Sequence, residues 1–344
     1  MKFDYVIGNP PYQDNTIGDN DSYAPPVYDK FIDASYTIAD KVELIHPARF
    51  LFNAGSTPKA WNKKMLSNEH FKILHCEQIS KNIFPNTDIK GGVAISYYDA
   101  KKDFGKIGTF TMYNELNSIM KKVEQSNGFS SLSEIAVSAY TYHLTKSLYN
   151  DNPELISNSS KGHEYDLKSN VFEYLSEIFY DTKPEDNKDY VQVLGRLNNE
   201  RTYKYIRKEY LTESINFSKY KIFIAGANGS GNLGESLSTP IVGMPFVGAT
   251  ESFMSIGSFD NEIEALNCIK YIKCKFNRVL LGVLKVTQNL TPEKYSYVPL
   301  QDFTEKSDID WTQSISEIDK QLYKKYNLEQ EEIEFIETNV KEME

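Results

Sequence analysis

Short apolar runs alternate with amphipathic stretches over the first hundred residues. Runs with the length of β-strands occupy 3–7, 42–45, 71–76 and 93–98, and helical spacing of apolar positions occupies 27–40 and 58–70. The run 3–7 reads as a short buried strand, and residues 13–26, rich in Asn, Asp, Gly and Pro, predict a loop. Strands that alternate with helices predict an α/β layer with a mainly parallel sheet.

The pattern changes after about residue 108. Helices are expected at 113–126 and 165–179, an apolar strand at 219–225, and one long or two short helices at 260–285. Two further helices are expected near 312–326 and 329–342. The chain therefore divides into an α/β layer over 1–108, an α+β region over 109–303 and a helical tail over 304–344.

Composition narrows the class of protein. A hydrophobic share of 40% over 344 residues is enough to build folded cores. Three cysteines without a CxxC pair favour a reducing compartment and argue against a disulfide scaffold or a zinc site, so no metal is expected. No apolar run approaches ~20 residues and no secretory signal is visible, so a cytoplasmic location without a membrane span is expected.

Charge is unevenly distributed. The segment from Asp302 to Glu344 holds 13 acidic and 5 basic residues, most of the net charge of −10. Basic residues gather instead over 196–221 and 265–292, and such patches can hold phosphates in a chain of acidic total charge. Solvated helix faces explain them equally well. The candidates for contacts with phosphates are Arg201, Lys204, Arg207, Lys273, Lys275 and Arg278.

One motif carries recognisable chemistry. Asn9-Pro10-Pro11-Tyr12 follows the apolar run 3–7, which has Asp4 near its start. This segment resembles the motif that ends the fourth strand of the S-adenosylmethionine-dependent amino-methyltransferases, specifically the adenine-specific DNA methyltransferases of bacterial type II restriction–modification systems. A plain proline turn after a strand is the alternative reading.

The resemblance implies a role for each residue of the motif. The exocyclic amine of adenine is a poor nucleophile because its lone pair is delocalised into the ring. The Asn9 side-chain oxygen and the Pro10 carbonyl would accept the two amine hydrogens and direct the lone pair at the methyl group. Pro10 and Pro11 would hold the loop rigid, and Tyr12 would stack on an adenine flipped out of the duplex.

Two later segments extend the resemblance. Residues 42–51 look like the next family segment, a strand ended by a proline and followed by a helix, and residues 88–98 look like the later glycine–aromatic strand. In the family, an aromatic of that strand packs on the other face of the target base. Tyr97 and Tyr98 point to opposite faces of a strand, so only one can serve, and Tyr97 is preferred. A core aromatic is an equal alternative.

The C-terminal half resembles the target-recognition region of the same methylases, which docks on duplex DNA. Within it, Asn228, Gly229 and Ser230 are candidates for DNA contacts, because amides of a glycine-rich loop can approach phosphates closely. A plain glycine turn is the alternative. The segments that carry this resemblance are 219–234, 238–241, 287–289, 297–303 and 322–328.

The cofactor motif of the family is not found. A glycine-rich turn and an acidic second strand would precede Asn-Pro-Pro-Tyr, yet only eight residues precede Asn9. The turn over 226–234 does not open a helix, because Pro240, Gly243 and Pro245 follow it. The fold expected is therefore the C-terminal half of a Rossmann-like methyltransferase sheet, and an N-terminal half or subunit that binds S-adenosylmethionine is expected as a partner beside double-stranded DNA.

Two other functions fit the same features. The chain could be a non-catalytic DNA-recognition subunit with a relic motif, or a component of a restriction endonuclease. Asp186-Asn187-Lys188 has the D-x-K form of some metal-dependent nucleases, but it sits in a polar stretch rather than a strand. Activity of the isolated chain is not expected to follow from the motif alone.

Overall fold

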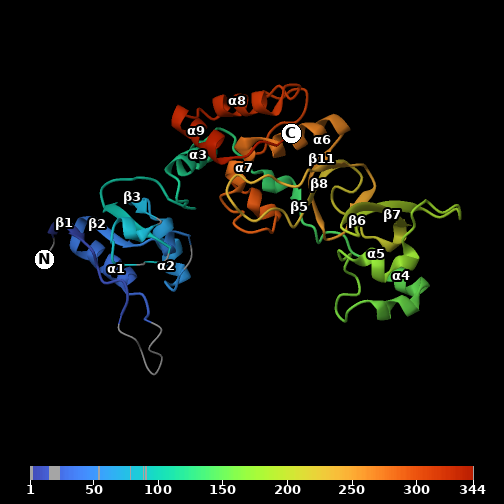
Figure 1. Ribbon diagram of the computed structural model, residues 1–344, viewed down its shortest axis with the longest axis horizontal. Helices are drawn as coiled ribbons and strands as arrows, with labels where there is room; N and C mark the ends of the chain where they lie inside the picture. Colours follow the sequence, from blue (N-terminus) through green and yellow to red (C-terminus); the bar gives the residue numbers. More distant parts are fainter. Residues whose placement is uncertain are drawn as a thin grey trace. The chain divides into compact units, whose positions relative to one another are not determined.

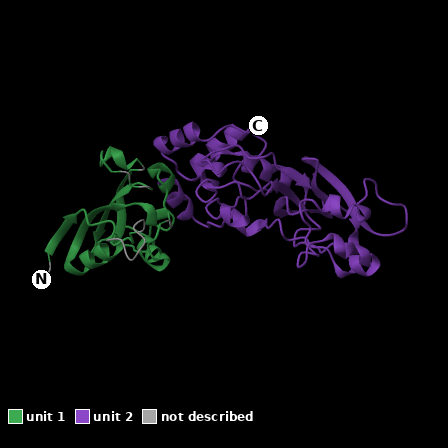
Figure 2. Cartoon of the chain, turned by 60° about the horizontal axis from the view of Figure 1, so that its bottom comes forward, with its two compact units in different colours: residues 1–117 green, residues 118–344 purple. Residues whose placement is uncertain are grey.

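The computed structural model divides the chain into two compact units, residues 1–117 and 118–344 (Figure 2). The structure describes residues 3–14, 24–52, 55–77, 79–87, 89 and 91–343. Most of the loop expected over 13–26 lies outside the described residues. Both units mix helices and strands, as the sequence pattern predicts.

Unit 1 contains a four-stranded sheet in the order β1-β2-β4-β3. Its strands are β1 (Phe3–Gly8), β2 (Ala39–Pro47), β3 (Phe71–Glu77) and β4 (Val93–Asp99). β1 and β2 are parallel, whereas β4 is antiparallel to both of its neighbours. The prediction of a mainly parallel sheet is therefore wrong. The helix α1 (Tyr28–Ile38) carries the chain back between β1 and β2, but no α-helix does so among the described residues between β3 and β4.

The helices of unit 1 cover one face of this sheet. Here α1 and α2 (Lys59–Leu66) enclose a core with the short 3-10 segment Arg49–Phe52. Core side chains from the strands include Val42, Leu44, Phe71 and Ala94, all nearly inaccessible to solvent.

β1 itself is not buried, contrary to the sequence prediction. Phe3, Tyr5 and Ile7 are 47%, 44% and 73% exposed. The reason is its position, because β1 is an edge strand and the helices pack against the other face of the sheet, where Val6 points. Apolar residues that would be core in a wider sheet thus remain on the surface of unit 1.

Unit 2 is built around two sheets that share one core (Figure 1). One has the order β10-β6-β7 and the other β5-β11-β8-β9. Their strands are β5 (Ala136–Val137), β6 (Tyr190–Leu197), β7 (Glu200–Arg207), β8 (Tyr220–Ala225), β9 (Ile241–Gly243), β10 (Val247–Ala249) and β11 (Phe253–Phe259). The basic segment 196–221 is thus largely a β-hairpin rather than a helix.

Helices close the remaining surfaces of unit 2. They are α3 (Asn114–Glu124), α4 (Lys146–Asp151), α5 (Val171–Tyr174), α6 (Glu262–Lys273), α7 (Lys275–Leu281), α8 (Ile315–Lys325) and α9 (Gln330–Asn339). The tail helices α8 and α9 occur where the sequence predicts them and pack on α6 and α7. Two short helices replace one long one over 260–285, because Cys274 is extended and Asp319 caps the amides of Lys275 and Phe276.

The helix expected over 165–179 is much shorter. The Tyr165 carbonyl accepts the Leu144 amide, and Asp166 forms an isolated β-bridge with His143. The first residues of this segment are therefore extended. Across the described residues, no helix combines the length and the hydropathy required to cross a bilayer.

His46 is a buried titratable group in the core of unit 1. Its Nδ1 lies 3.1 Å from the Pro47 carbonyl, so Nδ1 donates, and its Nε2 accepts from Ser96 Oγ at 2.8 Å. Burial, opposed only by the hydrogen bond to Pro47, lowers the pKa of His46 to about 4. The core therefore holds a neutral imidazole.

We expect unit 1 to lose stability as the pH falls from about 6.5 towards about 4. In that window the unfolded chain protonates His46 and the folded chain does not, so the unfolded state binds more protons. The stability advantage of wild type over His46→Gln should shrink by about 1.4 kcal/mol per pH unit in urea titrations. The matched control, His75→Gln at an exposed position of β3, should not change with pH in this way. A constant difference between wild type and His46→Gln would contradict the assignment.

Candidate active site and nucleic-acid interface

The Asn-Pro-Pro-Tyr loop begins at the end of the unit 1 sheet where β1, β2 and β3 finish and β4 starts. Gly8 at the end of β1 pairs with Leu44, close to the end of β2. Val93 at the start of β4 pairs with both Pro47 and Glu77, the last residues of β2 and β3. The strand register therefore brings the Asn9 loop to the same end of the sheet as the segment before β4.

The loop is anchored to the start of α1. The Tyr12 carbonyl accepts the Val27 amide at 3.2 Å, and the Asp14 amide donates to the Pro25 carbonyl at 2.9 Å. Asn9 and Pro11 are exposed, and Pro10 is half-buried. The Asn9 side chain makes no hydrogen bond within the described residues and is available to a ligand.

Tyr12 is half-buried, and its hydroxyl is buried without a hydrogen-bond partner among the described residues. Burial raises the pKa of Tyr12, so the phenol keeps its proton at neutral pH. A protonated, partly exposed ring directly after the two prolines is suited to stacking rather than to acid–base chemistry.

The two candidate stacking aromatics of β4 lie on opposite faces, as alternation requires. Tyr98 stacks on Tyr36 of α1 with ring centroids 3.9 Å apart, and so belongs to the core side. Tyr97 lies 6.3 Å from the Tyr5 ring and donates to Asp99 at 3.3 Å. It pairs with Glu43 and Lys72, and Glu43 also pairs with Ile7, so Tyr97 lies within the sheet, level with a residue two positions before Asn9.

An aromatic residue that the sequence analysis did not single out lies on a segment at this end of the sheet. Half-buried Phe84 follows β3, in the segment that leads back to β4, and its amide donates to the Ser80 carbonyl at 2.8 Å. The signal was the Phe84-Pro85 pair inside an otherwise polar stretch. The position of Phe84 can be interpreted only once β3 and β4 are known to be antiparallel. Both ends of the connecting segment then lie at the end of the sheet where the Asn9 loop begins.

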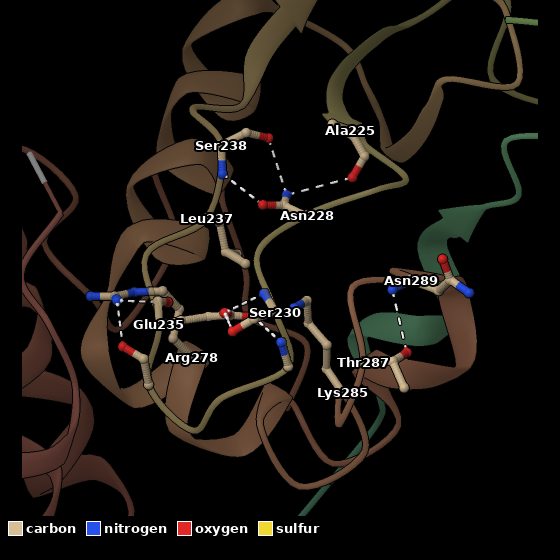
Figure 3. Close-up of polar contacts among 12 residues, drawn as sticks. Ala225, Asn228, Ser230, Glu235, Leu237, Ser238, Arg278, Lys285, Thr287 and Asn289 are labelled. Atoms are coloured by element: carbon tan, nitrogen blue, oxygen red, sulfur yellow. Dashed lines mark hydrogen bonds and ion pairs between the residues drawn. The ribbon is translucent and has the colours of Figure 1, made fainter.

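The glycine-rich loop of unit 2 surrounds a carboxylate that belongs to the chain itself (Figure 3). Glu235 accepts the amides of Ser230 and Gly231 at 2.6 and 2.9 Å and the Ser230 hydroxyl at 3.0 Å, and it pairs with the buried Lys285 ammonium. Burial alone would raise the pKa of Glu235, but Lys285 and these amides lower it to about 2. The amides expected to approach phosphates are therefore already occupied.

Gly229 and Asn228 support this arrangement. Gly229 has a φ of +63°, and a Cβ there would lie 2.3 Å from the Glu235 carboxyl carbon. Asn228 is buried, where its side-chain oxygen accepts the Ser238 amide at 2.8 Å and its amide nitrogen donates to Ser238 Oγ at 3.1 Å (Figure 3). Of the three predicted DNA contacts in this loop, Ser230 and Gly229 are exposed and Asn228 is not.

The predicted basic residues near α7 also have partners within the chain. The buried Arg278 guanidinium donates to the carbonyls of Lys273, Gly234, Glu235 and Lys341, and so ties the glycine-rich loop to the C-terminal tail. Lys275 is paired with Glu337 at 2.6 Å. Lys273 is half-buried beside them.

The basic residues of β7 are held in the same way. Arg201 donates to the Thr239 carbonyl at 2.6 Å, and Lys204 pairs with Asp181 at 2.6 Å. Arg207 pairs with Asp151 at 2.7 Å and with Glu209. The two predicted patches lie on separate elements, the β6–β7 hairpin and the α6–α7 pair, and each cation has a local structural role.

We expect Glu235→Gln to destabilise unit 2 by about 3 kcal/mol, because it leaves the Lys285 charge buried without its partner. The measurement is the midpoint of urea unfolding. The control is Glu213→Gln, which removes an exposed ion pair with Lys208 and should cost at most about 1 kcal/mol. Equal losses in the two variants would show that the Glu235 contacts do not support the loop.

The match to a known family lies within unit 1. Residues 1–84 match the family described as Eco57I restriction-modification methylase. A protein from Mycoplasma pneumoniae named "Uncharacterized adenine-specific methylase" is 33% identical over 95 residues, which cover 27% of this chain and 22% of that protein. The chain thus matches about a fifth of the length of this curated relative.

A solved structure resembles more of the chain, but weakly. The crystal structure of the type IIG restriction endonuclease BpuSI aligns with 88% of this chain and 44% of that protein, at a TM-score of 0.31 and 9% identity. The family match over residues 1–84 and the curated relative, not this alignment, confirm the resemblance to adenine-specific methyltransferases of restriction–modification systems.

Proposed function

We propose that this chain supplies the catalytic loop and the DNA-recognition region of a site-specific adenine DNA methyltransferase in a restriction–modification system. The observation that carries the proposal is the position of Asn9-Pro10-Pro11-Tyr12. The loop lies at the end of β1, within the residues that match the methylase family, and its Asn9 side chain is exposed. The proposed parts are a catalytic half-domain over 1–108, a recognition region over 109–303 and a helical tail over 304–344.

In this proposal the loop acts by polarising the target amine. The Asn9 side-chain oxygen and the Pro10 carbonyl accept its two hydrogens, which shifts electron density onto the nitrogen without a covalent intermediate. Tyr12 stacks on one face of the flipped adenine. Phe84 is better placed than Tyr97 to contact the other face of the adenine. The segment that contains Phe84 lies at the end of the sheet where Asn9 lies, whereas Tyr97 lies further along β4.

The methyl donor would be S-adenosylmethionine, but the glycine-rich loop does not fit it. That loop is followed by β9 rather than by a helix, and its amides at Ser230 and Gly231 bind Glu235. We therefore assign the cofactor site to a polypeptide segment beyond the described residues.

β1 shows where such a segment would attach. No described strand pairs with its outer edge, and Phe3, Tyr5 and Ile7 leave an apolar surface beside that edge. A sheet edge with exposed apolar residues is a template for pairing with another strand. We propose that the cofactor-binding half adds its strands there, so that β1 becomes an internal strand of a Rossmann-like sheet.

The alternatives find less support. A recognition subunit with a relic motif does not require an exposed Asn9 at the end of a family-matched strand. At the D-x-K sequence, Asn187 has a φ of 58°, and Asp186 accepts the Lys188 amide and the Tyr190 hydroxyl. That segment is a tight turn, so we propose no nuclease centre there.

The first test replaces the amine acceptor. Asn9→Ala should lower methyl transfer to duplex DNA by at least about a hundredfold in the complex with the cofactor-binding half, because one acceptor is lost. Binding of DNA and cofactor should persist. The control is Asn199→Ala at the exposed tip of the β6–β7 hairpin, which should methylate normally. If Asn9→Ala methylates as fast as wild type, the proposed mechanism is wrong.

The second test addresses the edge of β1. Ile7→Lys should reduce association with the polypeptide encoded immediately upstream at least tenfold in a copurification assay, because it places a charge in the surface to be buried. The control is Ile215→Lys, at an isoleucine that is 90% exposed in unit 2. Equal association of Ile7→Lys and wild type would remove β1 from the interface.

A further inference from the structure

Unit 2 contains a cleft of about 380 Å³ that none of the predicted DNA contacts lines. Its walls come from segments that are distant in the sequence. Side chains that line it include Tyr140, Ser169, Arg196, Glu251 and Asn289. The cleft belongs to unit 2, whereas the Asn9 loop belongs to unit 1.

Backbone pairing builds one wall of the cleft. The Leu290 amide donates to the Gly226 carbonyl at 2.8 Å, and the Gly226 amide donates to the Ser252 carbonyl at 2.9 Å. The Asn228 amide completes the arrangement by donating to the Gln288 carbonyl at 2.8 Å. This pairing fixes Asn289 in an exposed position, and its side chain points away from the Glu235 contacts (Figure 3).

Arg196 differs from the other basic residues of the β6–β7 hairpin. It is exposed and makes no ion pair or side-chain hydrogen bond within the described residues, whereas Arg201, Lys204 and Arg207 are all engaged. A guanidinium that is not used by the fold can form two parallel hydrogen bonds to a planar acceptor. Arg196 is thus the cation of this hairpin that is available to a ligand.

The other lining groups indicate what kind of ligand fits. Tyr140 is 66% exposed, which provides an apolar surface for contact with the methyl group of thymine. The Glu251 carboxylate accepts the Ser169 amide at 3.2 Å and repels a bare phosphate. Arginine, asparagine and glutamate side chains are the groups that pair with the edges of guanine, adenine and cytosine.

We infer that this cleft reads base edges of the DNA target, with Arg196 and Asn289 as specificity-determining residues and Tyr140 as a contact for thymine methyl groups. The inference rests on the proposed function, because it presumes that unit 2 contacts DNA. It differs from the sequence-based prediction, which placed the contacts on the glycine-rich loop and on the α6–α7 cations.

The test selects DNA with the full chain from a pool of duplexes that contain a randomised segment. Arg196→Ala and Asn289→Ala should each lose the preference at one or two positions of the selected sequence. Each should bind the selected duplex about tenfold more weakly, the loss of one bidentate base contact, and bind unselected duplex within twofold of wild type. The control is Thr202→Ala on the same hairpin, outside the cleft, which should select the same sequence as wild type.

Crosslinking gives an independent readout that does not depend on a variant. Selected duplexes with 5-iodouracil in place of thymine should crosslink to the peptide that contains Tyr140. If both variants keep the wild-type preference and crosslinks fall elsewhere in unit 2, the cleft is not the reading site, although unit 2 still binds DNA. If the wild-type chain selects no sequence from the pool, the inference fails together with the recognition role under the proposed function.

Discussion

A β-strand needs a neighbour on each side, or its edge must be protected, and β1 has a neighbour on one side only among the described strands. Its apolar side chains are exposed because the helices of unit 1 cover the opposite face of the sheet. The catalytic loop begins directly after this strand. The position of Asn9 therefore depends on a strand that has a described neighbour on one side only. This dependence links the proposed chemistry to the proposed partner segment.

Unit 2 follows a different constraint, the cost of burying charge. Lys285 and Arg278 lie inside the fold, and each is stabilised by oxygen atoms of the glycine-rich loop or of the C-terminal tail. Through these contacts the acidic tail becomes part of the folded unit. Charged residues that resemble a nucleic-acid patch in the sequence, such as Arg278 and Lys275, make contacts within the fold, whereas exposed Arg196 makes no ion pair or side-chain hydrogen bond within the described residues.

The two units thus suggest a division of labour. The Asn9 loop would act on a flipped base, while the cleft around Arg196 would read neighbouring base pairs. Methylation at a defined site requires both activities, since base flipping alone does not choose the site. The carboxylate of Glu235 binds the amides of Ser230 and Gly231 in the glycine-rich loop, whose Gly226 lines the cleft.

The sequence by itself determined the strands and helices of unit 1 and the tail helices, because apolar periodicity is a local property of the chain. It also led to the proposed chemistry of the Asn9 loop, since the proposed acceptors of the amine hydrogens lie next to each other in one short motif. Only the tertiary structure decided that β4 is antiparallel, that Tyr97 lies within the sheet at the level of Ile7, and that the segment with Phe84 lies at the end of the sheet where β1 finishes. It alone decided which cations are already paired, because the partners of Arg278 and Lys285 at Gly234, Glu235 and Lys341 are more than forty residues away in the sequence. Register and charge pairing depend on contacts between distant segments, and no local pattern encodes them.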